Sequence, residues 1–228
     1  MRMITSCTLL LGLLIFSAAS QVLGATQWTE GVNYFKILPP RAVSVPKGKV
    51  EVTEVFSYAC PACNAFVPVM HKMAQKLPAN AVLDFVPAAF NTSEDWPMFQ
   101  RAFYAAQALG IAEKTHDAMF DAVWKSRTLA TIDPRTERLA EHMPTIEDAA
   151  NFYHQAAGVS VQAFLDKANK DFTVDTNIRS ADAFVFGCRV DRTPTIVVNG
   201  KYRLYAESAG GPDQLVELVL WLVAQESR

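Results

Sequence analysis

The stretch FSYACPACNAF, residues 56–66, decides the fold because it holds two cysteines at the junction of two predicted elements. The residues before it, Lys49–Ala59, are rich in valine and aromatic side chains and predict a buried β-strand. The residues from Cys60 to about Lys76 predict a helix. The cysteine pair, Cys60 and Cys63, therefore lies where a strand gives way to a helix.

A structural disulfide and a metal site both explain this pair poorly. A bridge between residues three apart closes a very small loop, and the loop-entropy relation gives it about 2 kcal/mol, against about 3 kcal/mol for a 15-residue loop. A structural zinc site needs four ligands at close spacing. The remaining candidates are Cys188 and four scattered histidines that have no metal-ligand spacing and are more typical of ordinary surface or helix positions: His71, His116, His142 and His154.

A redox-active pair agrees best with the position of the two cysteines. Pro61 follows Cys60 at the first helical position, where the missing N–H of proline costs nothing. The first sulfur then faces unpaired backbone N–H groups and the positive end of the helix dipole, and both favour a thiolate. Cys63 lies one turn further along the helix, where it can close a disulfide. The sequence therefore predicts a Cys60 pKa below the ordinary value of about 8.5.

The remaining pattern predicts an α/β fold that is interrupted by helices. A second strand is expected over residues 81–90, with Pro87 at its end or at a sheet edge. Nearly all segments from residue 93 to 187 have helical spacing. Residues 193–206 predict a hairpin around the turn signal Asn199-Gly200, and residues 211–227 predict an amphipathic helix.

The amino terminus predicts export. Arg2 precedes the apolar run Leu9–Ser20, and small residues follow, which is typical of a secretory signal peptide cleaved after Gly24 or Ala25, with Ala19 as another possible site. We therefore expect residues 1–24 to be a signal peptide. The mature chain is expected to divide into residues 25–92, a helical insert over 93–187, and residues 188–228.

Composition limits the classes of partner. Without Arg2, the chain keeps 20 basic residues against 23 acidic ones, a net charge of about −3, and it has no basic run. This argues against binding to nucleic acid or to an anionic membrane. Half of the residues are hydrophobic, so the chain can form a real core without a dense set of disulfides.

CPAC after EVFSYA, together with RTPTIVVNGKYRL downstream and a helical segment between them, resembles the DsbA family of periplasmic thiol:disulfide oxidoreductases. The resemblance covers nearly the whole mature chain. It implies a thioredoxin fold with an inserted all-helical subdomain. It also implies that Thr193-Pro194 is a cis peptide facing the disulfide.

The resemblance also implies the roles of individual residues. Cys60 would be the exposed nucleophile and Cys63 the resolving thiol. Glu54 would be a buried acid that relays a proton to or from the second cysteine, although an edge-strand carboxylate facing solvent stays open as an alternative. The substrate-binding residues would be Thr193, Pro194, Pro61 and Ala62.

The family's partners follow from the same resemblance. The clients would be reduced exported proteins in the periplasm, and a DsbB-like membrane quinone reductase would reoxidise the chain. No metal or organic cofactor is expected, and the working form is expected to be a monomer.

Three positions depart from the best-known family members. Ala62 stands where they carry histidine, which predicts a less strongly oxidising enzyme. Those members have a lysine beside the buried acid, and in this chain that lysine is replaced near Phe85. Without the cation, the ionised form of Glu54 would be more costly. Thr193 is more typical of the related isomerases.

These departures leave two alternatives open. The first is a periplasmic disulfide reductase or isomerase, and the second is a non-catalytic peptide-binding module with a static disulfide. Phe56, Tyr58, Phe66 and Phe90 would line a peptide groove in such a module, although core positions are commoner for aromatic residues near a strand. Cys188 is expected to be a buried thiol without a redox role.

Overall fold

The computed structural model describes residues 28–227. The predicted signal peptide, its cleavage site and Cys7 lie outside these residues. Within them, no helix has both the length and the apolar character that a membrane crossing requires.

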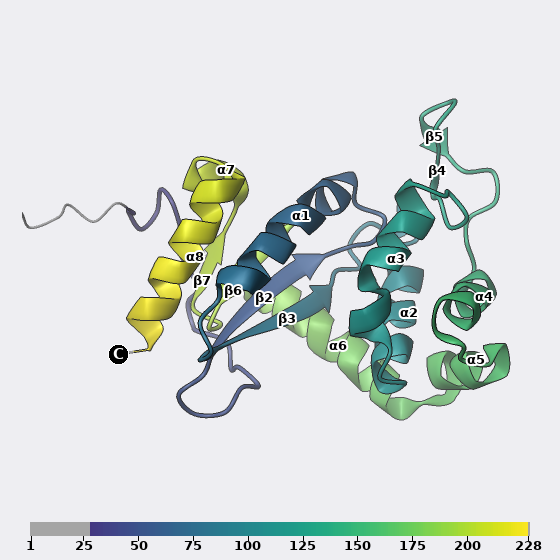
Figure 1. The fold of residues 1–228 in the computed structure, drawn as a ribbon, viewed down its shortest axis with the longest axis horizontal. Coiled ribbons are helices and arrows are strands. Elements are labelled where there is room, and N and C mark those ends of the chain that lie inside the picture. Colours follow the sequence, from purple (N-terminus) through teal and green to yellow (C-terminus); the bar gives the residue numbers. More distant parts are fainter. Residues whose placement is uncertain (1–27, 228) are drawn as a thin grey trace, which may run out of the picture.

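A five-stranded mixed sheet forms the centre of the protein (Figure 1). The strand order is β1-β7-β6-β2-β3; β2 and β3 are parallel, and the other neighbours are antiparallel. The strands are β1 (Phe35–Lys36), β2 (Val50–Phe56), β3 (Ala81–Pro87), β6 (Thr195–Val198) and β7 (Tyr202–Leu204). The predicted strands are confirmed, and β3 is an edge strand that ends at Pro87, as its proline indicated.

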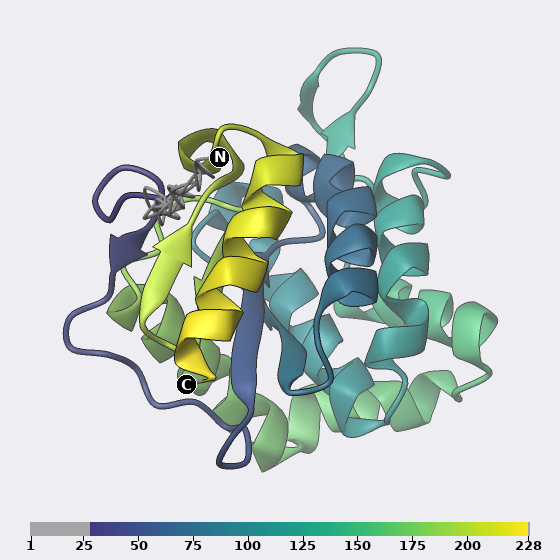
Figure 2. The same ribbon diagram turned by 60° about the vertical axis from the view of Figure 1, so that its left-hand side comes forward.

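Helices cover both faces of the sheet. On one face, α1 (Pro61–Lys76) and α8 (Pro212–Glu226) lie side by side, as Figure 2 shows. Their apolar residues form one core cluster with β2 and β6. On the opposite face, α6 (Phe172–Gly187) crosses behind the sheet. Because strands lie on both sides of β2 and helices cover both of its faces, all seven of its residues are buried.

A group of helices between β3 and β6 packs beyond the β3 edge of the sheet (Figure 1). It contains η1 (Thr92–Glu94), α2 (Trp96–Ala108), α3 (Ala112–Trp124), α4 (Ile146–Ala157) and α5 (Val161–Lys170), and α6 leads from it behind the sheet. Helix α4 begins at a capping box, in which Thr145 and Asp148 satisfy each other's backbone N–H groups. The four-residue helix α7 (Ala206–Ala209) precedes α8.

One part of the predicted helical segment is wrong. Residues 125–145 contain no helix, and β4 (Ile132–Asp133) pairs with β5 (Arg138–Leu139) in a small hairpin that projects from the helices (Figure 1). The Asp133 side chain accepts the Arg135 N–H at 2.8 Å across Pro134, and this local bond favours a turn over a helix.

The hairpin of β6 and β7 has the predicted turn. Asn199 and Gly200 have φ angles of 51° and 63°, as a two-residue turn with positive φ at both positions requires. A Cβ atom at Gly200 would collide with the Arg41 carbonyl. Glycine is therefore required here for two reasons, the backbone conformation and the close approach of another chain segment.

We predict that Gly200→Ala destabilises the protein more than Gly158→Ala does. Both glycines have positive φ, but nothing lies within 4 Å of a Cβ atom at Gly158. The control should lose about 1–2 kcal/mol of unfolding free energy from the backbone conformation alone. Gly200→Ala should lose about 2 kcal/mol more, because its neighbour is backbone that must move. Equal losses in urea unfolding would contradict this account of the turn.

Candidate active site

Cys60 is the N-cap residue of α1 and is 6% exposed, so the expectation of an exposed cysteine is wrong: the residue is buried beside the exposed Pro61 and Ala62. The turn that leads to it from β2 is held by local bonds: the Cys60 N–H donates to the Ser57 carbonyl at 3.1 Å, and the Ala59 N–H donates to Ser57 Oγ at 3.2 Å. From the helical region, Trp124 Nε1 donates to the Tyr58 carbonyl at 2.7 Å. The turn that positions the Cys60 sulfur is thus held by bonds within itself and by one bond from α3.

The surroundings of Cys60 favour its thiolate. The hydrogen bond from the Cys63 thiol, which is the largest cause, lowers the pKa of Cys60 to about 6 against the opposing effect of burial. A side-chain hydrogen bond from Thr193 and the backbone N–H groups of Cys63 and Ala62 act in the same direction. With such a pKa, about nine-tenths of the Cys60 sulfur is ionised at pH 7. The thiolate at the helix start, predicted from the sequence, is supported by this geometry.

Cys63 has the opposite character. It is fully buried, and burial raises the pKa of its thiol well above the usual range; the hydrogen bond that it makes to Cys60 and the Cys60 charge add to this effect. Cys63 therefore keeps its proton and donates it in a hydrogen bond to its partner. The two sulfurs, one turn apart, differ sharply in their readiness to ionise.

Thr193 and Pro194 face this pair. Their peptide bond is cis, and the Cys60 thiol donates to the Thr193 carbonyl at 3.5 Å. Ionisation of Cys60 removes that bond, because a thiolate can only accept. Thr193 Oγ1 is buried and makes no other hydrogen bond, so its hydroxyl is available to donate to the thiolate. Pro61 and Ala62 are exposed beside the same sulfur.

Glu54 is buried in the middle of the sheet and is 2% exposed, so the alternative of an edge-strand carboxylate facing solvent is wrong. Burial, and secondly the charge of Cys60, raise the pKa of Glu54 to about 8. Its neighbours in the ladder are Phe85 and Ile196, so neither adjacent strand places a cation directly beside it. Glu54 is therefore a carboxylic acid at neutral pH; it is close enough to Cys60 to respond to the charge of that sulfur, and its own charge raises the pKa of Cys63.

The structure also places the other residues considered in the sequence: the possible metal ligands, Cys188 and four aromatic side chains. Among residues 28–227, no group of three or more potential ligands could hold a metal ion. Cys188 is fully buried, and burial raises the pKa of its thiol to about 12. Phe56, Tyr58 and Phe66 belong to the core, whereas Phe90 is 49% exposed.

His116 lies in helix α3, one of the two positions predicted for it, and it is buried there and not at the surface. It is buried among aromatic rings, and its Nδ1 lies 2.9 Å from the Tyr58 hydroxyl. Burial lowers the pKa of His116 to about 4, so it is neutral at pH 7. Its spacing from the buried residues Met119, Phe120 and Val123 is helical, and this signal places it on an apolar face.

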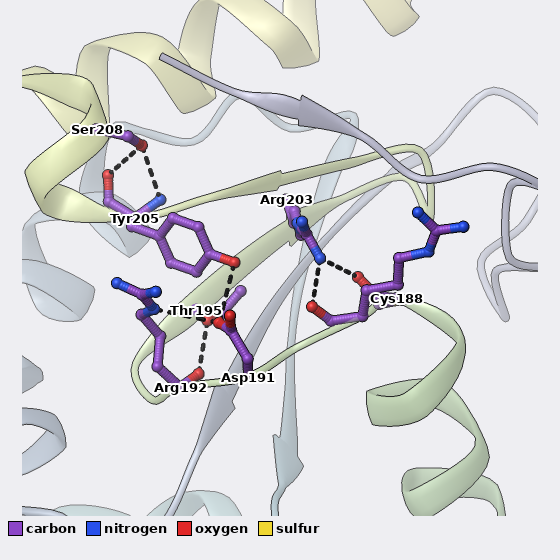
Figure 3. Close-up of polar contacts among 8 residues, drawn as sticks. Cys188, Asp191, Arg192, Thr195, Arg203, Tyr205 and Ser208 are labelled. Atoms are coloured by element: carbon purple, nitrogen blue, oxygen red, sulfur yellow. Dashed lines mark hydrogen bonds and ion pairs between the residues drawn. The ribbon is translucent and has the colours of Figure 1, made fainter. Parts of the chain in front are cut away.

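Sequence reasoning also missed a polar cluster next to Thr193 (Figure 3). Tyr205 Oη donates to Asp191 at 3.4 Å, Arg192 Nε donates to the same carboxylate at 3.1 Å, and the Arg192 guanidinium lies 4.8 Å from the Tyr205 ring centre. Thr195 Oγ1 donates to the Arg192 carbonyl at 2.7 Å. These contacts hold the segment that carries Thr193 and Pro194 to the start of β6 and to Tyr205, the residue after β7.

Known proteins share both this fold and much of this sequence. The thioredoxin family model matches residues 40–219. The thiol:disulfide interchange protein DsbA of Pseudomonas aeruginosa is 32% identical over 212 residues, which cover 93% of this chain and 90% of the relative. DsbA of Azotobacter vinelandii is 32% identical over 229 residues, which cover 99% of this chain and 98% of the relative.

Solved structures agree with these sequence matches. The crystal structure of Pseudomonas aeruginosa DsbA has a TM-score of 0.73 at 32% identity and covers 89% of this chain and 96% of its own. A Proteus mirabilis DsbA variant with the non-covalently bound peptide PWATCDS has a TM-score of 0.66 at 20% identity, covering 86% of this chain and 98% of its own, and shares the fold.

We predict that Glu54→Gln removes a pH-dependent loss of stability. The folded chain keeps the Glu54 proton up to about pH 8, whereas the unfolded chain releases it near the ordinary value of 4.5. The wild type therefore loses stability as pH rises from about 4.5 to 8, by about 3 kcal/mol at pH 7. Urea unfolding of both reduced proteins should show the variant gaining about that much on the wild type between pH 4 and pH 7. A constant difference would place Glu54 in contact with water.

The reduced and oxidised forms should also differ in how their unfolding free energy depends on pH. Here the effect of Cys60 is opposite to that of Glu54, because it stabilises the reduced form as pH rises. Folding lowers the pKa of Cys60 from 9.0 to about 6, so the reduced folded chain binds fewer protons than the unfolded chain in this window. Its stability relative to the oxidised form should rise by up to about 1.4 kcal/mol per pH unit between pH 6 and 9 and be lost as pH falls through 6. Parallel unfolding curves of the two forms across this range would argue against a stabilised thiolate.

Proposed function

Because the chain belongs to the DsbA family of thiol:disulfide interchange proteins, we propose that Cys60 exchanges with the thiols of client proteins and that Cys63 resolves the exchange. The chain is a protein thiol:disulfide oxidoreductase. The observation that carries the assignment of roles is the contrast between the two sulfurs, a low pKa at Cys60 and a high pKa at buried Cys63.

Client oxidation starts from the Cys60–Cys63 disulfide. A client thiolate attacks the Cys60 sulfur; the bond between the two cysteines breaks, and its electron pair leaves with Cys63 as a thiolate, which takes a proton. The first product is a mixed disulfide between Cys60 and the client. Cys63 is fully buried, so the attacking thiolate meets Cys60 first.

A second client thiolate completes the reaction. It attacks the client sulfur of the mixed disulfide, a client disulfide forms, and Cys60 leaves as a thiolate. In total, two electrons pass from the client to the pair. The same contacts that lower the pKa of Cys60 make it a good leaving group, because a thiol of lower pKa departs faster.

Glu54 supplies the proton for the buried sulfur in this proposal. Its pKa of about 8 lies near the working pH, where a group can both give and accept a proton. The charge of Glu54 raises the pKa of Cys63, so the two groups lie close enough to interact, which supports the assignment. As Cys63 leaves, Glu54 protonates it, and solvent restores the Glu54 proton afterwards.

The client is held by the surface around Cys60. Thr193 presents backbone groups beside the sulfur, and an extended client strand can pair with them. Pro194, Pro61 and Ala62 complete the contact surface in this proposal. The peptide in the Proteus mirabilis structure supports cysteine-containing polypeptides as the client class.

The cellular setting is also part of the proposal. The chain is exported to the periplasm, oxidises reduced exported proteins, and is reoxidised by a DsbB-like membrane protein that passes electrons to a quinone. In this proposal it acts as a monomer without a resident metal or organic cofactor.

Trapping experiments test these roles. We expect reduced Cys63→Ser to accumulate a mixed disulfide with a client peptide that contains a disulfide: the Cys60 thiolate attacks the client disulfide, one client sulfur leaves as a thiol, and no resolving thiol releases the adduct. Cys60→Ser should accumulate none. Gel mobility under non-reducing conditions and mass spectrometry report the adduct. The reverse pattern would overturn the assignment of nucleophile and resolving thiol.

A redox titration separates the oxidase from a reductase or isomerase. We expect a potential clearly above that of thioredoxin, about −270 mV, because a stabilised Cys60 thiolate favours the reduced pair. A potential as low as that of thioredoxin would contradict the proposed direction of electron flow.

A further inference from the structure

A polar cavity of about 290 Å³ lies between the sheet and α6, on the face opposite α1 (Figure 1). Its walls come from the segment before β2, from β2 and β3, and from α2 and α6. The volume is near the lower end of the range for small-molecule pockets, about 300 Å³. The polar side chains that line the cavity include Glu51, Asp84, Tyr104, Gln107, Asn177 and Ser180. The cavity is therefore rich in hydrogen-bonding groups, and two of them are carboxylates.

The cavity is separate from the proposed active site. Glu51 is the second residue of β2, and Phe56 is the last. These five steps of strand span roughly 16 Å, and the turn to Cys60 begins only after them. Neither Cys60 nor the Thr193-Pro194 segment lines the cavity. A molecule bound there is therefore distinct from a client in thiol–disulfide exchange.

Two acidic side chains face the cavity from neighbouring strands. Asp84 pairs with Thr53 in the parallel β2–β3 ladder, so it lies on the same sheet face as Thr53 and Glu51. Thr53 Oγ1 donates to Glu51 Oε1 at 3.2 Å, and the Ser44 N–H donates to Glu51 Oε2 at 3.1 Å. The bond from Thr53 orients the Glu51 carboxyl along the strand, towards Asp84. The spacing and rise of the strands place the Cα atoms of Glu51 and Asp84 about 8 Å apart, within reach of one shared ligand.

Neither carboxylate has a cation beside it. Among residues 28–227, Glu51 and Asp84 take part in no ion pair. Glu51 is 5% exposed; burial raises the pKa of its carboxyl, and the charge of Asp84 raises it further. Burial also raises the pKa of Asp84. Because buried charges are costly unless they are paired, a cation bound between these two groups would offset their burial and their repulsion.

Tyr104 supplies a third group without a partner. Its side chain is 6% exposed and lines the cavity, yet its hydroxyl makes no hydrogen bond to any of the described residues. Burial, and secondly the charge of Asp84, raise the pKa of Tyr104, so the hydroxyl lies near that carboxyl and keeps its proton. Buried tyrosine hydroxyls normally have a hydrogen-bond partner. The free hydroxyl is therefore a sign of a ligand that is independent of the two acids.

These three groups suit an ammonium ion better than a metal ion. A primary ammonium has three N–H donors and no acceptor, and Glu51, Asp84 and Tyr104 offer three acceptors. A calcium ion takes about six to eight oxygen ligands, and within residues 28–227 no group of three acidic, histidine or cysteine side chains could hold a metal ion. The cavity is also several times larger than a single water molecule, about 30 Å³, so it has room for a short organic body beside Gln107 and Asn177.

We propose that this cavity binds a small primary amine, with its ammonium group between Glu51 and Asp84 and against the Tyr104 hydroxyl. The body of the ligand is short and polar, as in an amino alcohol or a short diamine. Because the folded chain alone presents this set of acceptors, the bound amine also stabilises the fold. The inference goes beyond the proposed function and does not depend on it.

The test uses ethanolamine and 1,4-diaminobutane as probes, in isothermal titration calorimetry and thermal unfolding at constant ionic strength. Tetramethylammonium, which has the charge without N–H donors, and 1,4-butanediol, which has the chain without the charge, are the control ligands. Asp84→Asn removes one carboxylate and Tyr104→Phe removes the hydroxyl, and both keep the shape of the side chain. Glu217→Gln is the matched control, because it removes the same charge from an exposed position of α8 on the opposite face of the sheet.

We expect at least one of the two amines to bind the wild type and to raise its unfolding temperature, and neither control ligand to do so. Asp84→Asn should lower the affinity by at least about tenfold, because a hydrogen bond to a charged group is lost. Tyr104→Phe should lower it about fivefold, since its hydrogen bond is to a neutral acceptor. Glu217→Gln should change it by less than about twofold, because solvent and salt screen an exposed charge.

Three results would overturn the inference. The first is a wild type that neither amine binds or stabilises. The second is equal binding of the amines and tetramethylammonium, or an equal effect of Asp84→Asn and Glu217→Gln, which would show unspecific attraction of cations. The third is binding of calcium chloride in place of the amines, with loss of that binding in Asp84→Asn, which would assign the cavity to a metal ion.

Two further variants keep the test decisive. Should Asp84→Asn fail to fold, Glu51→Gln replaces it, with the same expected loss of affinity. Cys60→Ser should bind the amine as the wild type does, because the cavity contains no part of the cysteine pair. A wild type that exchanges with no thiol client but still binds the amine would end the proposed function and leave this inference in place.

Discussion

The hydrogen bonds to the sulfur of Cys60 are the interaction on which the rest of the site depends. They come from the Cys63 thiol, from Thr193 and from two backbone N–H groups at the start of α1, and they outweigh the opposing effect of burial. Each donor is placed by a different part of the fold: the helix start by the turn after β2, and Thr193 by the segment that enters β6. The sheet serves to bring these two segments to one edge.

Cys63 and Glu54, the neighbours of Cys60, have different roles in this arrangement. Burial keeps Cys63 protonated, so it can donate to the thiolate in the reduced form and needs a proton when it leaves the disulfide. Burial also keeps Glu54 protonated near neutral pH, so that a carboxylic acid inside the core can donate a proton to Cys63 when it leaves the disulfide. Because Phe85 and not a cation stands beside Glu54, the carboxylic acid stays neutral at a cost to stability at higher pH.

Local patterns predicted much of this structure. The strand before Cys60, the helix after it and the Asn199-Gly200 turn are each specified by residues within a few positions, so the sequence was sufficient for them. The β4–β5 hairpin was missed because helical spacing nearby outweighed the turn signal at Asp133-Pro134. The burial of Glu54 depends on the strands and helices that pack around β2, and the family resemblance indicated it, whereas residue type alone favoured a solvent-facing carboxylate. The burial of His116 had a local signal, its helical spacing from Met119, Phe120 and Val123, that was not used. The cavity beside Tyr104 requires segments that are distant in sequence, and no local pattern contains that information.

The pKa of Cys60 in the reduced protein is the most direct measurement of the central claim. Either the rate of alkylation by iodoacetamide or the ultraviolet absorbance of the thiolate can be followed across pH, with Cys60→Ser as the blank for Cys63 and Cys188. The account predicts a single transition near pH 6 that is absent in the blank. A transition near the ordinary thiol value of about 8.5 would show that the helix start does not stabilise this sulfur, and the proposed chemistry would have no basis.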